Sequence, residues 1–292
     1  MALKYVLVIF ISVHLQLFTT EAVQEIWEKC SLSCGGGVQR KKGMKNVTRM
    51  CNLLNCPGDA GCLSVHYTFD TLMDGRAYDT SNNANHGTIA GTAKLENNGK
   101  FAKCLHLPKH SNVSLGAKGF HNRPSSAITV ALWVKTTSST GKHELFHTCA
   151  SDVANGKAQF HFEINDGKVR WLHRDHMERT VFNVISESSV PTDTWTHIAG
   201  TYRTSTRVAK IYINGENGKL STNSQLQKFG KNARVDALSP DWGCANIGDY
   251  RNERPLDGYI DDFFIFKCEL MAVEITDLYQ SGSFKRHGIP VP

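Results

Sequence analysis

The segment Trp195-Thr-His-Ile-Ala-Gly-Thr-Tyr202, followed by Lys210-Ile-Tyr-Ile-Asn-Gly215, decides the fold of this 292-residue chain. Both runs are rich in β-branched and aromatic residues, which favour strands, and Asn214-Gly215 predicts a tight hairpin turn. Short runs of the same kind, separated by turn signals such as Asn165-Asp-Gly167, recur across residues 62–281. Short strands at regular spacing are typical of an antiparallel β-sandwich. We therefore predict an all-β fold for this part of the chain.

The order of these motifs resembles the laminin-G-like, concanavalin A-like jelly roll. The pattern opens with Tyr67-Thr-Phe69-Asp and closes with Gly258-Tyr-Ile-Asp261-Asp-Phe-Phe-Ile-Phe266, and a short helix is predicted from Met271 to Tyr279. The resemblance implies an antiparallel jelly-roll sandwich over residues 62–281, with residues 282–292 as a C-terminal tail. Ligands of such folds are held by loop side chains that vary freely, so the ligand-binding residues stay unknown at this point.

Residues 1–22 have the pattern of a signal peptide. Their apolar run is too short to span a bilayer, which needs ~20 residues, and Thr20 and Ala22 are small residues that suit cleavage. We expect a secreted protein without a membrane span, in a compartment where disulfides form by default. Asn46 and Asn112 each begin an Asn-x-Thr/Ser sequon, so N-glycosylation is predicted at both.

Residues 23–57 form a small cysteine-rich module. Its sequence runs from Trp27-Glu-Lys-Cys30-Ser-Leu-Ser-Cys34 to Cys51-Asn-Leu-Leu-Asn-Cys56-Pro57, a length that buries too little apolar surface to fold without crosslinks. The module resembles a shortened thrombospondin type 1 repeat, which implies the disulfides Cys30–Cys51 and Cys34–Cys56. Its basic run Arg40-Lys-Lys-Gly-Met-Lys45 is a candidate contact for a sulfated glycan, although a solvated loop is the simpler interpretation.

The nine cysteines of the chain cannot all pair with one another. Four belong to the small module, and five remain in the large domain. The first and last strands of this jelly roll are antiparallel neighbours, so the resemblance implies a Cys62–Cys268 disulfide. Of Cys104, Cys149 and Cys244 at most two can pair, and their spacing does not choose between them. The remaining thiol either is buried as a small apolar group or links two chains into a disulfide-bonded oligomer.

Calcium is the cofactor that the resemblance implies. Asp79 lies in a loop rich in asparagine, and Asp261 belongs to the closing Gly-x-Ile-Asp motif. In many laminin-G-like domains the matching Asp residues help to bind a structural Ca²⁺, so Asp79 and Asp261 are the candidate ligands. The alternative is that these Asp and Asn side chains cap turns, which alone explains their enrichment in loops.

Composition and histidine spacing argue against two other classes of site. The net charge is +6, from 33 Lys and Arg against 27 Asp and Glu, without a basic helical stripe or zinc-finger spacing, so we do not expect nucleic-acid binding. The pairs His143/His147 and His173/His176 have helical spacing but fall in segments predicted as strand or loop. A zinc site is therefore not predicted.

Hydrolysis of glycosides is an alternative function, because glucanases share this jelly roll. A glycosidase needs two carboxylates on one face, ~5–5.5 Å apart in a retaining enzyme. Glu163 and Asp166 are three residues apart, so on a strand they would point to opposite faces. We predict that the protein is not an enzyme.

These observations favour a secreted extracellular-matrix or adhesion protein that binds carbohydrate or protein ligands without catalysis. A narrower version places it in a mineralised organic matrix. The alternative is a soluble, calcium-dependent, immune-type lectin, and a glycoside hydrolase is the least favoured hypothesis. The expected partners are extracellular glycans or matrix proteins.

Overall fold

The computed structural model describes residues 37–43, 48–51, 61–81, 83–116, 120–149, 158–175, 179–216, 238, 242–248 and 253–281. The chain divides into two compact units, residues 1–52 and 53–292. In the smaller unit, β1 (Gly37–Arg40) pairs antiparallel with β2 (Thr48–Cys51). The predicted disulfides Cys30–Cys51 and Cys34–Cys56, the sequon at Asn46, the signal peptide and the C-terminal tail lie outside the residues or side chains described.

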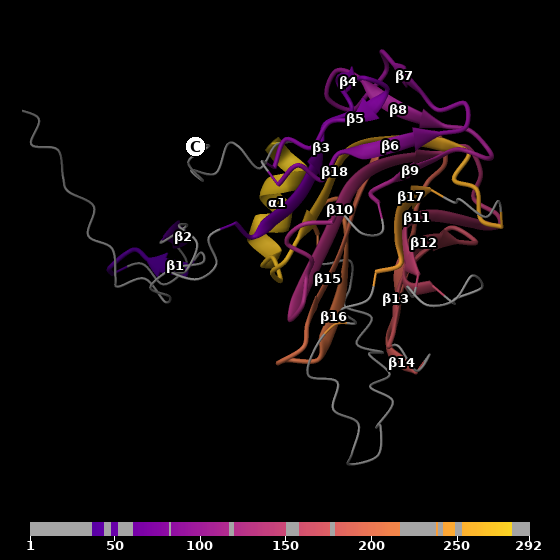
Figure 1. Cartoon of the computed structure of the whole chain (residues 1–292). Helices are drawn as coiled ribbons and strands as arrows, with labels where there is room; N and C mark the ends of the chain where they lie inside the picture. Colours follow the sequence, from indigo (N-terminus) through magenta and orange to yellow (C-terminus); the bar gives the residue numbers. More distant parts are fainter. Residues whose placement is uncertain are drawn as a thin grey trace, which may run out of the picture. The chain divides into compact units, whose positions relative to one another are not determined.

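The larger unit contains two antiparallel β-sheets (Figure 1). The seven-stranded sheet consists of β3 (Leu63–Tyr67), β7 (Lys94–Glu96), β8 (Cys104–Leu107), β10 (Ala127–Thr136), β15 (Thr196–Arg203), β16 (Val208–Ile213) and β18 (Gly258–Phe266). The nine-stranded sheet consists of β4 (Leu72–Met73), β5 (Arg76–Ala77), β6 (Gly87–Ala90), β9 (Asn112–Ser114), β11 (Lys142–Cys149), β12 (Ala158–Asn165), β13 (Lys168–Arg174), β14 (Thr180–Ser189) and β17 (Cys244–Gly248). The predicted all-β sandwich is thereby confirmed.

The main core lies between the two sheets. Side chains alternate along each strand, so Val130, Leu132 and Val134 of β10 point inward and meet aromatic residues from the other sheet, such as Phe162 and Trp171. All five are at most 1 % exposed. Burial of this continuous apolar surface supplies the main driving force for packing the sheets together.

A second, smaller core lies on the outer side of the seven-stranded sheet. Helix α1 (Ala272–Ser281) packs there, and Figure 1 shows the seven-stranded sheet between this helix and the nine-stranded sheet. Ile275 and Leu278 of the helix belong to one buried cluster with Ala131 of β10 and Phe264 of β18. Glu274 accepts a hydrogen bond from the backbone N of Met271 (2.7 Å), which fixes the first turn of the helix. In the described part of the chain, none of the helices is long and apolar enough to cross a membrane.

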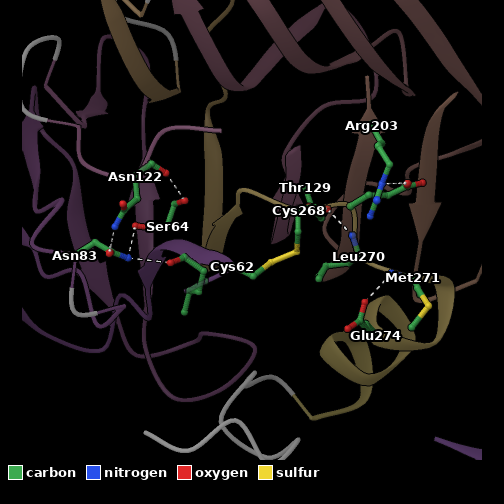
Figure 2. The surroundings of a disulfide bond; sticks show 12 residues. Cys62, Ser64, Asn83, Asn122, Thr129, Arg203, Cys268, Leu270, Met271 and Glu274 are labelled. Carbon is green, nitrogen blue, oxygen red and sulfur yellow. Dashed lines mark hydrogen bonds and ion pairs between the residues drawn. A yellow bond between two sulfur atoms is a disulfide. The ribbon is translucent and has the colours of Figure 1, made fainter. Parts of the chain in front are cut away.

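The predicted disulfide Cys62–Cys268 is confirmed (Figure 2). It joins the residue before β3 to the segment between β18 and α1, with the two Cα atoms 5.7 Å apart. Thr129 of β10 donates a hydrogen bond to the Cys268 carbonyl (2.8 Å) and accepts one from the backbone N of Leu270 (3.0 Å). The bridge is therefore anchored to the centre of the sheet as well as to its first strand.

The structure also identifies the pairing among the three remaining cysteines of this unit. Cys149 of β11 and Cys244 of β17 lie opposite each other on neighbouring strands and form a disulfide. Cys104 of β8 is free and fully buried, and burial raises the pKa of its thiol to about 11. A buried, protonated thiol of this kind matches the alternative of a small apolar group.

Candidate functional site

A row of mostly polar side chains crosses the outer face of the nine-stranded sheet, the face that points away from the main core. His147 lies opposite His161 on one side and Asn246 on the other, whereas their neighbours along the strands, such as Phe160 and Ile247, belong to the core. We call this set the polar row; it comprises Arg76, Thr88, Ser114, Asn246, His147, His161, Leu172 and Asn183.

The polar row is buried at its centre and more accessible at its two ends. His147 and His161 are 5 % and 8 % exposed. Thr88 is exposed at one end, and Asn183 is half-buried at the other. Beside Asn183 on the same face of β14 lies Ile185, whose exposed fraction is 47 %. A ligand can therefore reach the row most readily from its ends.

Two buried carboxylates lie next to the centre of the row. Glu144 of β11 and Glu163 of β12 face each other across the strands. Glu163 accepts a hydrogen bond from Arg170 at 3.0 Å on one oxygen and from Arg254 on the other, so both of its oxygens are ion-paired. Glu144 is 2.9 Å from Nδ1 of His161. Burial, assisted by the positive charge of Arg254, lowers the pKa of His161 to about 4, so this ring is neutral at pH 7.

The same carboxylates are also candidate metal ligands. Glu144 and Glu163 can each offer a carboxylate oxygen, and His161 a ring nitrogen, with all three atoms within 4.8 Å of one another. Among the described residues, this is the group whose spacing could hold a metal ion. However, a cation there would lie beside the guanidinium groups that already neutralise Glu163. The arrangement is better explained as an ion-pair network that stabilises this face than as a metal centre.

Glu144 is the residue that sequence reasoning missed. Glu144 and Glu163 can each bring one carboxylate oxygen to within 4.8 Å of the other, but this pairing joins two strands and depends on their register. Asp166, the other acidic residue of this segment, lies in the turn after β12 and accepts a hydrogen bond from the backbone N of Gly141 (2.9 Å). Both oxygens of Glu163 are ion-paired, so neither is available for nucleophilic attack or proton transfer. The geometry therefore favours a structural role for the pair.

Asp79, a predicted calcium ligand, lies in the loop between β5 and β6 and is 2 % exposed. Its carboxylate accepts hydrogen bonds from the backbone N of His66 (3.0 Å), Ser81 (2.9 Å) and Asn85 (2.9 Å), and from the Ser81 hydroxyl (2.8 Å). Asn85 in turn binds the carbonyl of Ser64 (2.9 Å). These contacts are the capping interactions of the alternative interpretation, and they hold the asparagine-rich loop against β3.

Asp261, the other predicted ligand, lies on β18 opposite Trp133 and is 1 % exposed. Its carboxylate accepts hydrogen bonds from the backbone N of Phe101 (3.0 Å) and of Asp262 (2.9 Å). Burial raises the pKa of Asp261 to about 7 and that of Asp262 to about 8. Neither Asp79 nor Asp261 belongs to the three-residue group described above, and calcium binding by them stays a prediction.

The histidine pairs do not assemble a metal site within the described residues. His143 of β11 contacts the carbonyl oxygens of Pro255 (3.1 Å) and Thr140 (3.0 Å), whereas His147 belongs to the polar row. His173 stacks on Phe160 with ring centroids 4.0 Å apart, and His176 lies outside the described residues. The predicted glycosylation site Asn112 is half-buried on β9, on the same outer face as the polar row and two residues from Ser114.

Comparison with solved structures finds the same fold in three other domains. Domain 4 of AbnA, a GH43 extracellular arabinanase from Geobacillus stearothermophilus solved with arabinotriose, is 24 % identical, with a TM-score of 0.56, covering 75 % of this chain and 98 % of that domain. The ligand-binding domain of botulinum neurotoxin serotype D, solved with N-acetylneuraminic acid, is 16 % identical, with a TM-score of 0.53, covering 75 % of this chain and 51 % of that one. The binding domain of serotype G is similar at 17 % identity and a TM-score of 0.53, with 76 % and 51 % covered. The chain thus spans about half the length of these toxin domains.

At these identities the solved structures show a shared fold, and the family comes from the sequence itself. No curated protein matches the chain. Residues 108–276, more than half of the chain, match the family model described as the concanavalin A-like lectin/glucanases superfamily. The match includes the decisive segment on β15 and β16 and extends into helix α1. The chain belongs to the concanavalin A-like lectin/glucanases superfamily.

Proposed function

We propose that this chain is an extracellular, non-catalytic carbohydrate-binding protein with an adhesion or matrix role. The observation that carries the proposal is the polar row, a set of amide, hydroxyl, imidazole and guanidinium groups along one sheet face. Sugar hydroxyl groups both donate and accept hydrogen bonds, so a surface of mixed donors and acceptors suits them. The similar domains solved with arabinotriose and N-acetylneuraminic acid support the same class of ligand.

The end of the polar row at β13 and β14 is the place where we expect the sugar to bind. Arg170 donates a hydrogen bond from Nε to Oδ1 of Asn183 (2.9 Å), which orients the Asn183 amide group on the outer face. Ile185, opposite Arg170, is a large exposed apolar side chain beside these polar groups. A pyranose or furanose ring presents both hydroxyl groups and an apolar C–H face, so this combination matches it.

The state of the buried carboxylates supports the proposal of a non-catalytic protein. Glu163 is fully buried and ion-paired on both oxygens, and Glu144 is tied to His161. A glycosidase needs one carboxyl group that can donate a proton to the leaving group and another that can act as base or nucleophile. Neither role suits Glu163 in this arrangement.

The proposal is tested by screening the purified chain against a glycan array and then titrating arabino-oligosaccharides and sialylated oligosaccharides. We expect saturable binding without release of reducing ends. Asn183→Ala combined with Ile185→Ser should weaken binding at least tenfold, whereas Thr88→Ala at the opposite end should leave it within twofold. Wild-type hydrolysis that disappears in Glu163→Gln would show an enzyme instead. Repeating the titration with a calcium chelator tests Asp79 and Asp261, because a calcium-dependent lectin would lose binding.

The extracellular location rests on the disulfides. Two disulfides in the larger unit, Cys62–Cys268 and Cys149–Cys244, are typical of proteins that mature in an oxidising compartment. Expression of the full chain in a eukaryotic cell line, followed by fractionation of medium and matrix and by endoglycosidase treatment, tests secretion, retention and the sequons together. Retention of the chain in the cytosol in reduced form would contradict the location.

A further inference from the structure

We propose that the outer face of the seven-stranded sheet carries a second, independent binding site, for a sulfated polysaccharide. The site is built around Lys100 and Lys135, which we call the ring-held lysines. Lys100 Nζ lies 4.3 Å from the ring centroid of Trp133, and Lys135 Nζ lies 4.4 Å from that of Tyr259 and 5.3 Å from that of Trp195. Each ammonium group is thus positioned by aromatic rings.

The ring-held lysines contact aromatic rings in place of an ion-pair partner among the described residues, although the buried Asp261 lies opposite Trp133 on the same strand pair. Among the described residues, ion pairs join other lysines of this sheet to carboxylates: Lys94 to Glu96 (2.9 Å) and Lys210 to Glu269 (2.8 Å). Neither Lys100 nor Lys135 has an ion pair of this kind within the described ranges. A cation–π contact orients an ammonium group without neutralising it, so both cations stay available for an anion.

The aromatic residues around Lys135 form a continuous cross-strand row. His106 of β8 lies opposite Tyr259 of β18 and stacks on it, with centroids 4.6 Å apart, and Tyr259 lies opposite Lys135 of β10. Trp195, just before β15, is fixed by a hydrogen bond from Nε1 to the carbonyl of Asn98 (3.2 Å). Neighbouring rings and cations order these side chains, so little conformational entropy is lost on binding a ligand.

The cross-strand row of His106, Tyr259 and Lys135 lies beyond the part of the seven-stranded sheet that helix α1 covers. Tyr279, in the last turn of α1, stacks on Trp133 with ring centroids 5.4 Å apart. Past Trp133, the side chains of Lys135, Tyr259 and Trp195 are half-buried, and Lys100 is exposed. Trp133 and Lys135 are two residues apart on one strand face, a spacing of ~6.6 Å, so both cations can contact one polysaccharide chain. The sulfate groups would pair with the ammonium groups, and the ring edges would contact the sugar backbone.

Charge complementarity selects this occupant over a neutral glycan. A neutral sugar would accept hydrogen bonds from the two ammonium groups without pairing their charge, whereas a sulfated chain presents closely spaced anions that pair with both. The site uses a different sheet from the polar row and different chemistry. Its failure therefore leaves the proposed function untouched, and the converse also holds.

The experiment is titration of the full chain with a size-defined heparin dodecasaccharide. We expect Lys100→Ala with Lys135→Ala to weaken binding at least tenfold and to lower its dependence on salt concentration. The charge-matched control, Lys142→Ala with Lys168→Ala, should change binding less than twofold, because those lysines lie on β11 and β13 of the other sheet. Lys100→Arg with Lys135→Arg should retain binding, since guanidinium groups also stack on aromatic rings.

Two results would overturn the proposal. Equal loss in the test and control pairs would show a general effect of net charge. Loss of binding in Arg40→Ala with Lys41→Ala and Lys42→Ala, with no loss in the Lys100 and Lys135 variants, would place the site in the small N-terminal unit. Thermal unfolding of each variant shows whether it is folded, and binding of arabino-oligosaccharides provides the separate readout for the polar row.

Discussion

Gly200, in the middle of the segment that decides the fold, is required by packing rather than by backbone conformation. A Cβ atom at this position would lie 3.1 Å from the rings of both Phe162 and Trp171, which are fully buried in the opposite sheet. The glycine therefore allows β15 to approach these two rings closely. Cores at native density tolerate little added volume.

We predict that Gly200→Ala lowers the free energy of unfolding by about 1–3 kcal/mol, the usual cost of overpacking a core. Urea unfolding with an unchanged m-value measures the loss. Combining it with Phe162→Leu, which frees space beside the new methyl group, should make the two changes less costly than the sum of their separate effects. Strict additivity would show that the Phe162 ring does not limit the site.

The ends of strands β3 and β18 and the start of helix α1 are held together by Cys62–Cys268. The cysteines are 206 residues apart in sequence, so the crosslink closes a large loop and lowers the conformational entropy of the unfolded chain. We predict that Cys62→Ala with Cys268→Ala lowers the free energy of unfolding by about 3–5 kcal/mol. Urea unfolding of the variant with Cys149–Cys244 intact provides the measurement. Cys104→Ala, which removes a buried thiol outside any disulfide, should cost only about 1 kcal/mol.

The strands could be predicted from the sequence, but their register within the sheets could not. The alternation of apolar residues predicted the strands, and the resemblance implied that the first and last strands are neighbours, which was enough for Cys62–Cys268. Strand pairing across the sheet determines that Glu144 lies opposite Glu163 and that Cys149 lies opposite Cys244. That register is set by tertiary packing and by bulges such as the one between Glu144 and Phe146, which leave no local signal.

The stability of the whole molecule should depend on pH in a way set by four buried groups. The pKa values of His161 and His197 are lowered by burial to about 4 and about 3, so the unfolded chain binds more protons there between pH ~3 and 6.5. The pKa values of Asp261 and Asp262 are raised by burial to about 7 and about 8, so here the folded chain binds more protons, from pH ~4 to 8. The two effects oppose each other between pH ~4 and 6.5, and above that range only the carboxyl groups contribute.

We therefore predict that the free energy of unfolding falls by roughly 2–3 kcal/mol between pH 6.5 and 8.5, since each proton released on this side costs about 1.4 kcal/mol per pH unit. Chemical unfolding at a series of pH values measures the slope. Asp262→Asn, which cannot ionise, should flatten most of it, whereas Asp166→Asn at the surface should leave it intact. A wild-type stability that is constant or rises over this interval would contradict the assignment.

The closure of the larger unit by Cys62–Cys268 has a consequence for its covalent integrity. The bridge turns nearly all of this unit into a ring, and Cys149–Cys244 adds a second ring inside it. A single proteolytic cut in any loop between Cys62 and Cys268 opens the ring without releasing a fragment. The two pieces stay joined through the disulfide, so we expect a nicked molecule to remain one covalent unit until the bridge is reduced.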